Sequence, residues 1–193
     1  MSISDAQRAR HQQCLQEAEG YLELLTVFEE KWPLSYECRK PLAEYVLKLL
    51  SHEDPHHVLL AKQLFLRGDA LRVLHRHDEA VEALEQAVDL APESIHIWLM
   101  LGWCYKRCGK LDEAIASLEN ALEFEPGEAV LWYNLACYWS LADKAPKAAH
   151  FLSMAFDINS NYCELVGDES DFDLIREHPA FLAVIRPEYE RQE

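Results

Sequence analysis

Cysteine and histidine are the side chains of this sequence best suited to metal binding or nucleophilic chemistry, and the chain has six and nine of them. Cys104 and Cys108 stand one helical turn apart, but two thiols are too few for a structural zinc site. His75 and His77 flank one arginine and are expected on opposite sides of a helix end, with no zinc-ligand spacing to a cysteine or carboxylate. We therefore predict no metal site and no cofactor.

Motifs for catalysis are equally weak. The run from Gly102 to Lys110 is longer than a phosphate-binding loop allows, and Leu111 stands where that loop needs Ser or Thr. The sequence also lacks the Gly-x-Ser-x-Gly pattern of a nucleophile elbow. The sequence thus predicts no catalytic residues and a protein that is not an enzyme.

The composition of the chain limits the classes of partner that it can bind. The 193 residues include 18 Lys plus Arg against 34 Asp plus Glu, a net charge of −16, while half are hydrophobic. Such an acidic chain is unsuited to nucleic acid or to an anionic membrane surface, since both require clustered cations. The N-terminus has no apolar stretch typical of a signal peptide. We expect a cytoplasmic protein whose cysteines are free thiols.

The sequence repeats with a period of 34 residues. The units are 61–94, 95–128 and 129–162, and equivalent positions hold similar residues. Small residues recur in one column and leucine in another: Gly68, Gly102 and Ala136; Leu84, Leu118 and Leu152. Small residues allow two antiparallel helices to approach closely, so a fixed period of this length predicts stacked helical hairpins.

The middle unit resembles the tetratricopeptide repeat pattern, which it matches at Trp98, Leu101, Gly102, Tyr105, Ala114, Leu118, Ala121 and Pro126. The first unit departs from the pattern at Leu64 and Arg67, and the third lacks the final proline. The resemblance implies an all-α protein, a tetratricopeptide-type α-solenoid of three helix-turn-helix repeats with helical caps before and after it.

The flanks are expected to be those caps. Residues 1–60 form the N-terminal helical extension, with one long helix over 4–31 and a second over about 41–51. Residues 163–193 carry capping helices and an acidic tail, where Asp171 can cap one helix and Pro179 can open another. This C-terminal segment is either a moving lid or a static cap, and we favour the static cap.

The resemblance also implies where a partner binds, since groove-facing residues of the family lie on the first helix of each pair. Carried onto this chain, the partner-binding groove is basic and aromatic, and its residues are Lys62, Phe65, Arg72, His96, Leu99, Trp103, Lys106, Arg107, Tyr133 and Cys137. The sequence leaves open whether the N-terminal helices or the acidic tail cover it.

The sequence thus predicts a non-catalytic protein–protein interaction module, a scaffold or adaptor. Its concave groove would take a peptide or partner helix with apolar anchors and acidic flanks, because aromatic residues and arginine dominate binding hot spots. The alternative is a small acidic secretion-type chaperone of the same repeat family, which dimerisation through residues 4–31 would favour. The sequence indicates neither the partner nor the oligomeric state.

Overall fold

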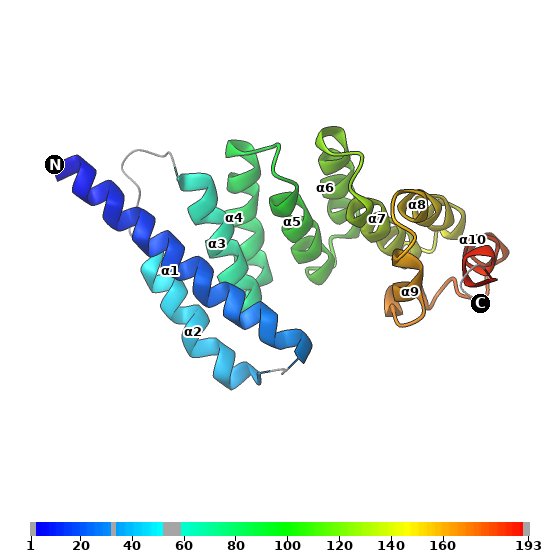
Figure 1. The fold of residues 1–193 in the computed structure, drawn as a ribbon, viewed down its shortest axis with the longest axis horizontal. Helices are drawn as coiled ribbons and strands as arrows, with labels where there is room; N and C mark the ends of the chain where they lie inside the picture. Colours follow the sequence, from blue (N-terminus) through cyan, green and yellow to red (C-terminus); the bar gives the residue numbers. More distant parts are fainter. Residues whose placement is uncertain (1–2, 32–33, 52–58, 191–193) are drawn as a thin grey trace. The chain divides into compact units, whose positions relative to one another are not determined.

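The computed structural model describes residues 3–31, 34–51 and 59–190, and the regular elements in these ranges are all helical, as predicted (Figure 1). The chain divides into two compact units, Met1–Cys108 and Gly109–Glu193. The N-terminal unit holds α1 (Ile3–Lys31), α2 (Tyr36–Leu49), α3 (Leu60–Val73), α4 (His77–Leu90) and α5 (Ile95–Arg107). The C-terminal unit holds α6 (Leu111–Phe124), α7 (Ala129–Leu141), α8 (Ala145–Ile158), α9 (Tyr162–Val166), η1 (Ser170–Phe172) and α10 (Pro179–Glu190).

The repeat period reappears in the turns inside the hairpins. The backbone is left-handed at three positions that are 34 residues apart, with φ of 58° at His75, 74° at Gly109 and 55° at Asp143. In the first and third hairpins the N–H group at this position bonds back to the preceding helix: His75 to Arg72, and Asp143 to Ser140. Such left-handed ends close a helix tightly and most often use glycine.

Two tryptophans anchor the start of their repeats. The indole Nε1–H of Trp98 donates to the carbonyl of Pro92 at 2.8 Å, and that of Trp132 donates to the carbonyl of Pro126 at 2.8 Å. The large ring thus packs on its neighbours while its one polar group is satisfied by the loop before the helix. The recurrence explains why the repeat pattern keeps both tryptophan and proline.

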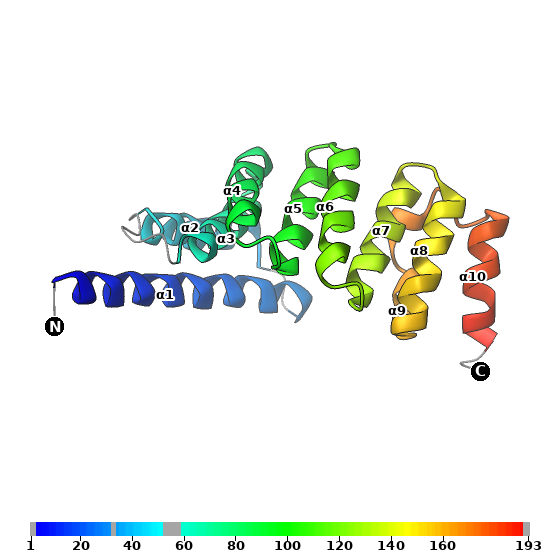
Figure 2. The same cartoon turned by 90° about the horizontal axis from the view of Figure 1, so that it is seen from above.

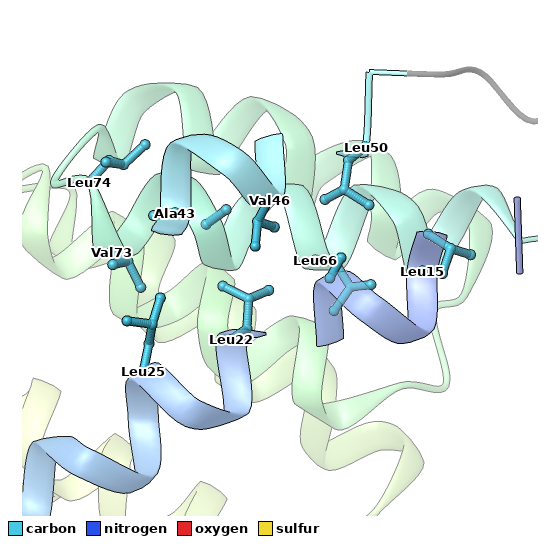
Figure 3. Packing of buried hydrophobic residues seen from close by; sticks show 11 residues of the cluster. Leu15, Leu22, Leu25, Ala43, Val46, Leu50, Leu66, Val73 and Leu74 are labelled. Atoms are coloured by element: carbon cyan, nitrogen blue, oxygen red, sulfur yellow. The ribbon is translucent and has the colours of Figure 1, made fainter. Parts of the chain in front are cut away.

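The core of the N-terminal unit has two parts. In the first, α1 and α2 lie side by side and cover α3 (Figure 1). Figure 3 shows the leucines of α1 pointing toward α2 and α3, and the labelled residues are Leu15, Leu22, Leu25, Ala43, Val46, Leu50, Leu66, Val73 and Leu74. The second part lies among α3, α4 and α5 and includes Leu71, Leu84 and Leu101.

The C-terminal unit is built on the pair α7 and α8, which pack along their length. Helix α10 lies beside α8 (Figure 2). The short helix η1 packs against α7. Phe172 and Phe181 are buried with their ring centroids 5.3 Å apart. Arg176 fastens the segment between them, because its guanidinium donates to the carbonyls of Val166 and Glu169.

The observed helix boundaries show which helix ends the sequence pattern predicted correctly. The long N-terminal helix and the helix that opens at Pro179 lie where they were predicted. The second helix begins at Tyr36 instead of 41, since the carbonyl of Ser35 already accepts the N–H groups of Cys38 and Arg39. The cap of η1 is also different from the prediction: the Glu169 carboxylate accepts the N–H of Asp171.

Replacing glycine by alanine should have opposite effects on the free energy of unfolding at two positions of the N-terminal unit. A Cβ at Gly68 would lie 2.7 Å from Cγ of the buried Leu84, whereas a Cβ at Gly20 would meet nothing within 4 Å. We expect Gly68→Ala to lower the free energy of unfolding by about 1 kcal/mol or more through overpacking. Gly20→Ala should raise it by about 0.5–1 kcal/mol, because alanine loses less entropy in a helix. Urea denaturation of both variants measures this, and equal signs would contradict it.

Candidate partner-binding surface

Eight of the predicted groove residues lie on α3 and α5 of the N-terminal unit: Lys62, Phe65 and Arg72 on α3, and His96, Leu99, Trp103, Lys106 and Arg107 on α5. Helices α3 and α5 contact each other directly. Three of the eight are exposed and the other five are partly buried. The structure therefore gathers most of the predicted set within one unit.

The N-terminal helix occupies part of this surface. Lys62 Nζ lies 2.7 Å from the Glu19 carboxylate of α1, and Phe65 packs against the core that α1 forms with α2 and α3. The N-terminal helices thus cover the beginning of α3, one of the two possibilities that the sequence left open. The surface that remains accessible is the C-terminal end of α3 and the length of α5.

Two predicted groove residues are buried inside the C-terminal unit, which corrects the prediction for them. Tyr133 is 6% exposed and Cys137 is 2% exposed. The ring of Tyr133 lies 5.0 Å from that of Tyr162 and 5.8 Å from that of Phe172, so the C-terminal segment covers this face of α7. Burial also raises the pKa of the Tyr133 hydroxyl. Neither side chain can contact a partner in this conformation.

The indole of Trp103 and two guanidinium groups lie together on the accessible surface. The guanidinium carbons of Arg72 and Arg107 lie 5.5 and 5.6 Å from the centroid of Trp103. Arg72 also pairs with Asp69 on its own helix at 2.8 Å, which fixes its side chain. Both arginines stand in the last turns of their helices, where positive charge is favoured. Cation–π contact orients them around one aromatic ring.

Three residues adjoin this surface that the sequence did not place there, because they come from separate elements. The ring of His77 lies edge-on to Trp103 at 5.4 Å and to His75 at 5.8 Å, so the two histidines lie together and not on opposite sides of the helix end. Tyr36 of α2 stacks on His75 at 5.2 Å. One signal was available, since His75 occupies the turn position that holds Gly109 in the next repeat.

The surroundings of His77 disfavour its protonated form. Burial and the charge of Arg107 lower the pKa of His77, and His75 and Arg72 act in the same direction. Asp78 opposes them with the weakest of these effects. His77 Nδ1 is buried without a hydrogen-bond partner.

Within the described ranges, little supports a reactive thiol, a metal site or a membrane-spanning helix. Burial raises the pKa of the Cys104 thiol to about 12, so this thiol is a poor nucleophile. Within these ranges, no three His, Cys, Asp or Glu side chains are placed to hold a metal ion. No helix that the structure describes is both long enough and apolar enough to cross a membrane.

These helical hairpins, with their recurrent turns and anchored tryptophans, define a helical repeat protein. Residues 74–136 match the sequence profile of the tetratricopeptide repeat family, which supports the resemblance of the repeats to that family.

Solved structures show the same fold. A thermophilic tetratricopeptide protein of Thermus thermophilus has a TM-score of 0.62 at 17% identity, covering 90% of this chain and 89% of its own. YrrB, described as having an unusual peptide-binding site, gives 0.56 at 24% identity over 78% and 73%. MamA gives 0.54 at 17% identity over 85% and 98%. No curated protein matches the chain in sequence.

Proposed function

We propose that this protein is a non-catalytic interaction module, a scaffold or adaptor. It binds a peptide or helix of another protein on the surface formed by α5 and the C-terminal end of α3. The residues of this surface are Arg72, His96, Leu99, Trp103, Lys106 and Arg107. The observation that carries the proposal is Trp103, a partly exposed indole whose ring two arginines contact, in a chain of net charge −16.

The chemistry of the partner follows from the surface. Leu99 and Trp103 suit apolar anchors, and the arginines suit acidic flanks. The chain itself provides an example on the neighbouring part of α3, where α1 presents buried leucines together with Glu19 to Lys62. A partner helix with the same combination of leucine and glutamate fits the remaining surface. The unusual peptide-binding site described for YrrB supports this use of the fold.

Capture from native lysate by matched baits tests the proposal. One bait is the wild type and the second carries Trp103→Ala, Lys106→Glu and Arg107→Glu. The third is a control with the same types of change on α2, namely Tyr45→Ala, Lys40→Glu and Lys48→Glu, at exposed positions. Circular dichroism checks that all three are folded.

We expect the wild type and the α2 control to capture the same protein and the α5 variant to lose it. With the purified partner, the α5 variant should bind at least about thirtyfold more weakly, since hot-spot residues contribute about 2 kcal/mol or more. Equal affinity of all three baits would show that the surface is wrong.

The chaperone alternative differs in its oligomeric state, because it would dimerise through residues 4–31. In this structure the apolar face of α1 is buried against its own α2 and α3. Sedimentation velocity separates the two functions: a monomer favours the adaptor, and a dimer that dissociates on substitution of exposed α1 residues favours the chaperone.

A further inference from the structure

Four rings from four parts of the N-terminal unit form one continuous array. Tyr36 begins α2, His75 lies in the turn after α3, His77 begins α4, and Trp103 lies on α5. Each ring contacts the next, with centroid distances of 5.2, 5.8 and 5.4 Å. The array therefore joins the proposed surface to a histidine pair that the proposed function does not use.

His75 holds its ring at the left-handed turn position that Gly109 and Asp143 occupy in the other repeats. Its φ of 58° is left-handed, a conformation that costs a residue with a Cβ about 1 kcal/mol and that the next repeat gives to Gly109. His75 keeps an exposed imidazole at this position, stacked on Tyr36.

The charged groups around the histidines come from every element packed there. Arg72 and Asp69 belong to α3 and pair with each other, Arg107 belongs to α5, and Asp78 belongs to α4. Positive charge dominates at His77, since Arg107, His75 and Arg72 all disfavour its protonated form more than Asp78 favours it. This balance of charge favours binding of an anion over protonation of His77.

We propose that Arg72, Arg107, His75, His77 and Trp103 form a proton-linked anion site, which takes a carboxylate side chain of an acidic protein segment and binds it more tightly as the pH falls. The proposal rests on the proposed function and adds its regulation. Burial lowers the pKa of His77 most, and repulsion by Arg107, His75 and Arg72 lowers it further. An anion bound by the arginines offsets this repulsion, so anion binding favours the protonated form of His77. Because linkage is reciprocal, a protonated His77 strengthens anion binding to the same extent.

An unpartnered ring nitrogen of His77 supports this coupling between anion binding and protonation. His77 Nδ1 lies buried without a hydrogen bond, and protonation turns both ring nitrogens into donors. A carboxylate suits the site better than a phosphate, since Asp69 and Asp78 would repel a dianion more strongly than a single charge.

Titration of the full chain with a peptide of six glutamates tests the site at pH 6.0 and pH 8.0 and constant ionic strength. A six-glutamine peptide and inorganic phosphate are the comparison probes. The readout is the NMR signal of the Trp103 indole, assigned with Trp103→Phe. Glutamate stays ionised at both pH values. We expect the glutamate peptide to bind at least about fivefold more tightly at pH 6.0, and the glutamine peptide to bind at neither.

Variants show whether the histidines carry the effect. His75→Asn with His77→Gln should remove the pH dependence and keep the affinity of pH 8.0, since asparagine tolerates the left-handed backbone. His150→Gln, at an exposed histidine of α8 outside the array and outside the proposed surface, should leave the pH dependence intact. Loss of the effect in both variants, its persistence in the first, or tighter binding of phosphate would overturn the proposal.

The outcome is separable from that of the proposed function. If the captured partner depends on Trp103 but neither it nor the glutamate peptide binds more tightly at pH 6.0, the proton-linked site is wrong and the interaction surface stands. If the partner binds independently of Trp103, the proposed function fails as well.

Discussion

Replacement of Phe172 by alanine is expected to lower the free energy of unfolding of the C-terminal unit by about 3–5 kcal/mol. The Phe172 side chain is fully buried, and its ring lies between those of Tyr133 and Phe181. Its removal leaves a cavity and takes away the contact that holds η1 on α7. Urea denaturation measures the loss.

A matched control stands two residues further along the chain. Leu174 is 67% exposed, so Leu174→Ala should change the free energy of unfolding by no more than about 0.5 kcal/mol. In Phe172→Ala the buried Cys137 should also become reactive to a thiol reagent, with the labelled cysteine identified by mass spectrometry. Equal stability of the two variants would show that the segment does not pack on α7.

The same experiment decides between the two interpretations of the C-terminal segment. Segments that move as lids are usually weakly packed. This segment instead buries Phe172, Ile175 and Phe181, and hydrogen bonds from Arg176 hold it in place. A large loss of stability in Phe172→Ala favours the static cap. A small loss with a reactive Cys137 in the wild type favours the lid.

The fold could be predicted because the same pattern of residues occurs in three successive units. Each unit carries its own small residues, leucines and turn, so an error in one unit is corrected by the others. Gly68 is an example, since its contact with Leu84 is the close helix approach that the repeat pattern predicts. The left-handed turns recur at the same period even where His75 and Asp143 replace glycine.

The site could be predicted only in part, because periodicity does not say what covers a helix. Helix α7 has buried residues around most of its circumference, so the sequence offers no polar side that distinguishes a groove face from a core face. Tyr133 and Cys137 were therefore assigned to the groove by resemblance, but both are buried, and the rings of Tyr162 and Phe172 from later in the chain cover Tyr133. The contact of Tyr36 with His75 is equally invisible in sequence, since it depends on how α2 packs.

The covering of α3 by α1 gives the second large expected effect. Leu22 is 3% exposed and faces α2 and α3, so Leu22→Ala should lower the free energy of unfolding of the N-terminal unit by about 2–5 kcal/mol (Figure 3). Leu24 lies on the same helix at 50% exposure, and Leu24→Ala should change it by no more than about 0.5 kcal/mol. Urea denaturation of the two variants measures the difference.

The leucines, and not the ion pair, hold α1 in place. The Glu19 and Lys62 side chains are both more than a third exposed, and exposed pairs contribute about 0–1 kcal/mol. Glu19→Gln should therefore change stability little, while Leu22→Ala should make α1 sensitive to limited proteolysis before the rest of the unit. If Leu22→Ala and Leu24→Ala are equally stable, α1 is not docked on α3. Lys62 and Phe65 would then belong to the open surface, which would extend along both helices.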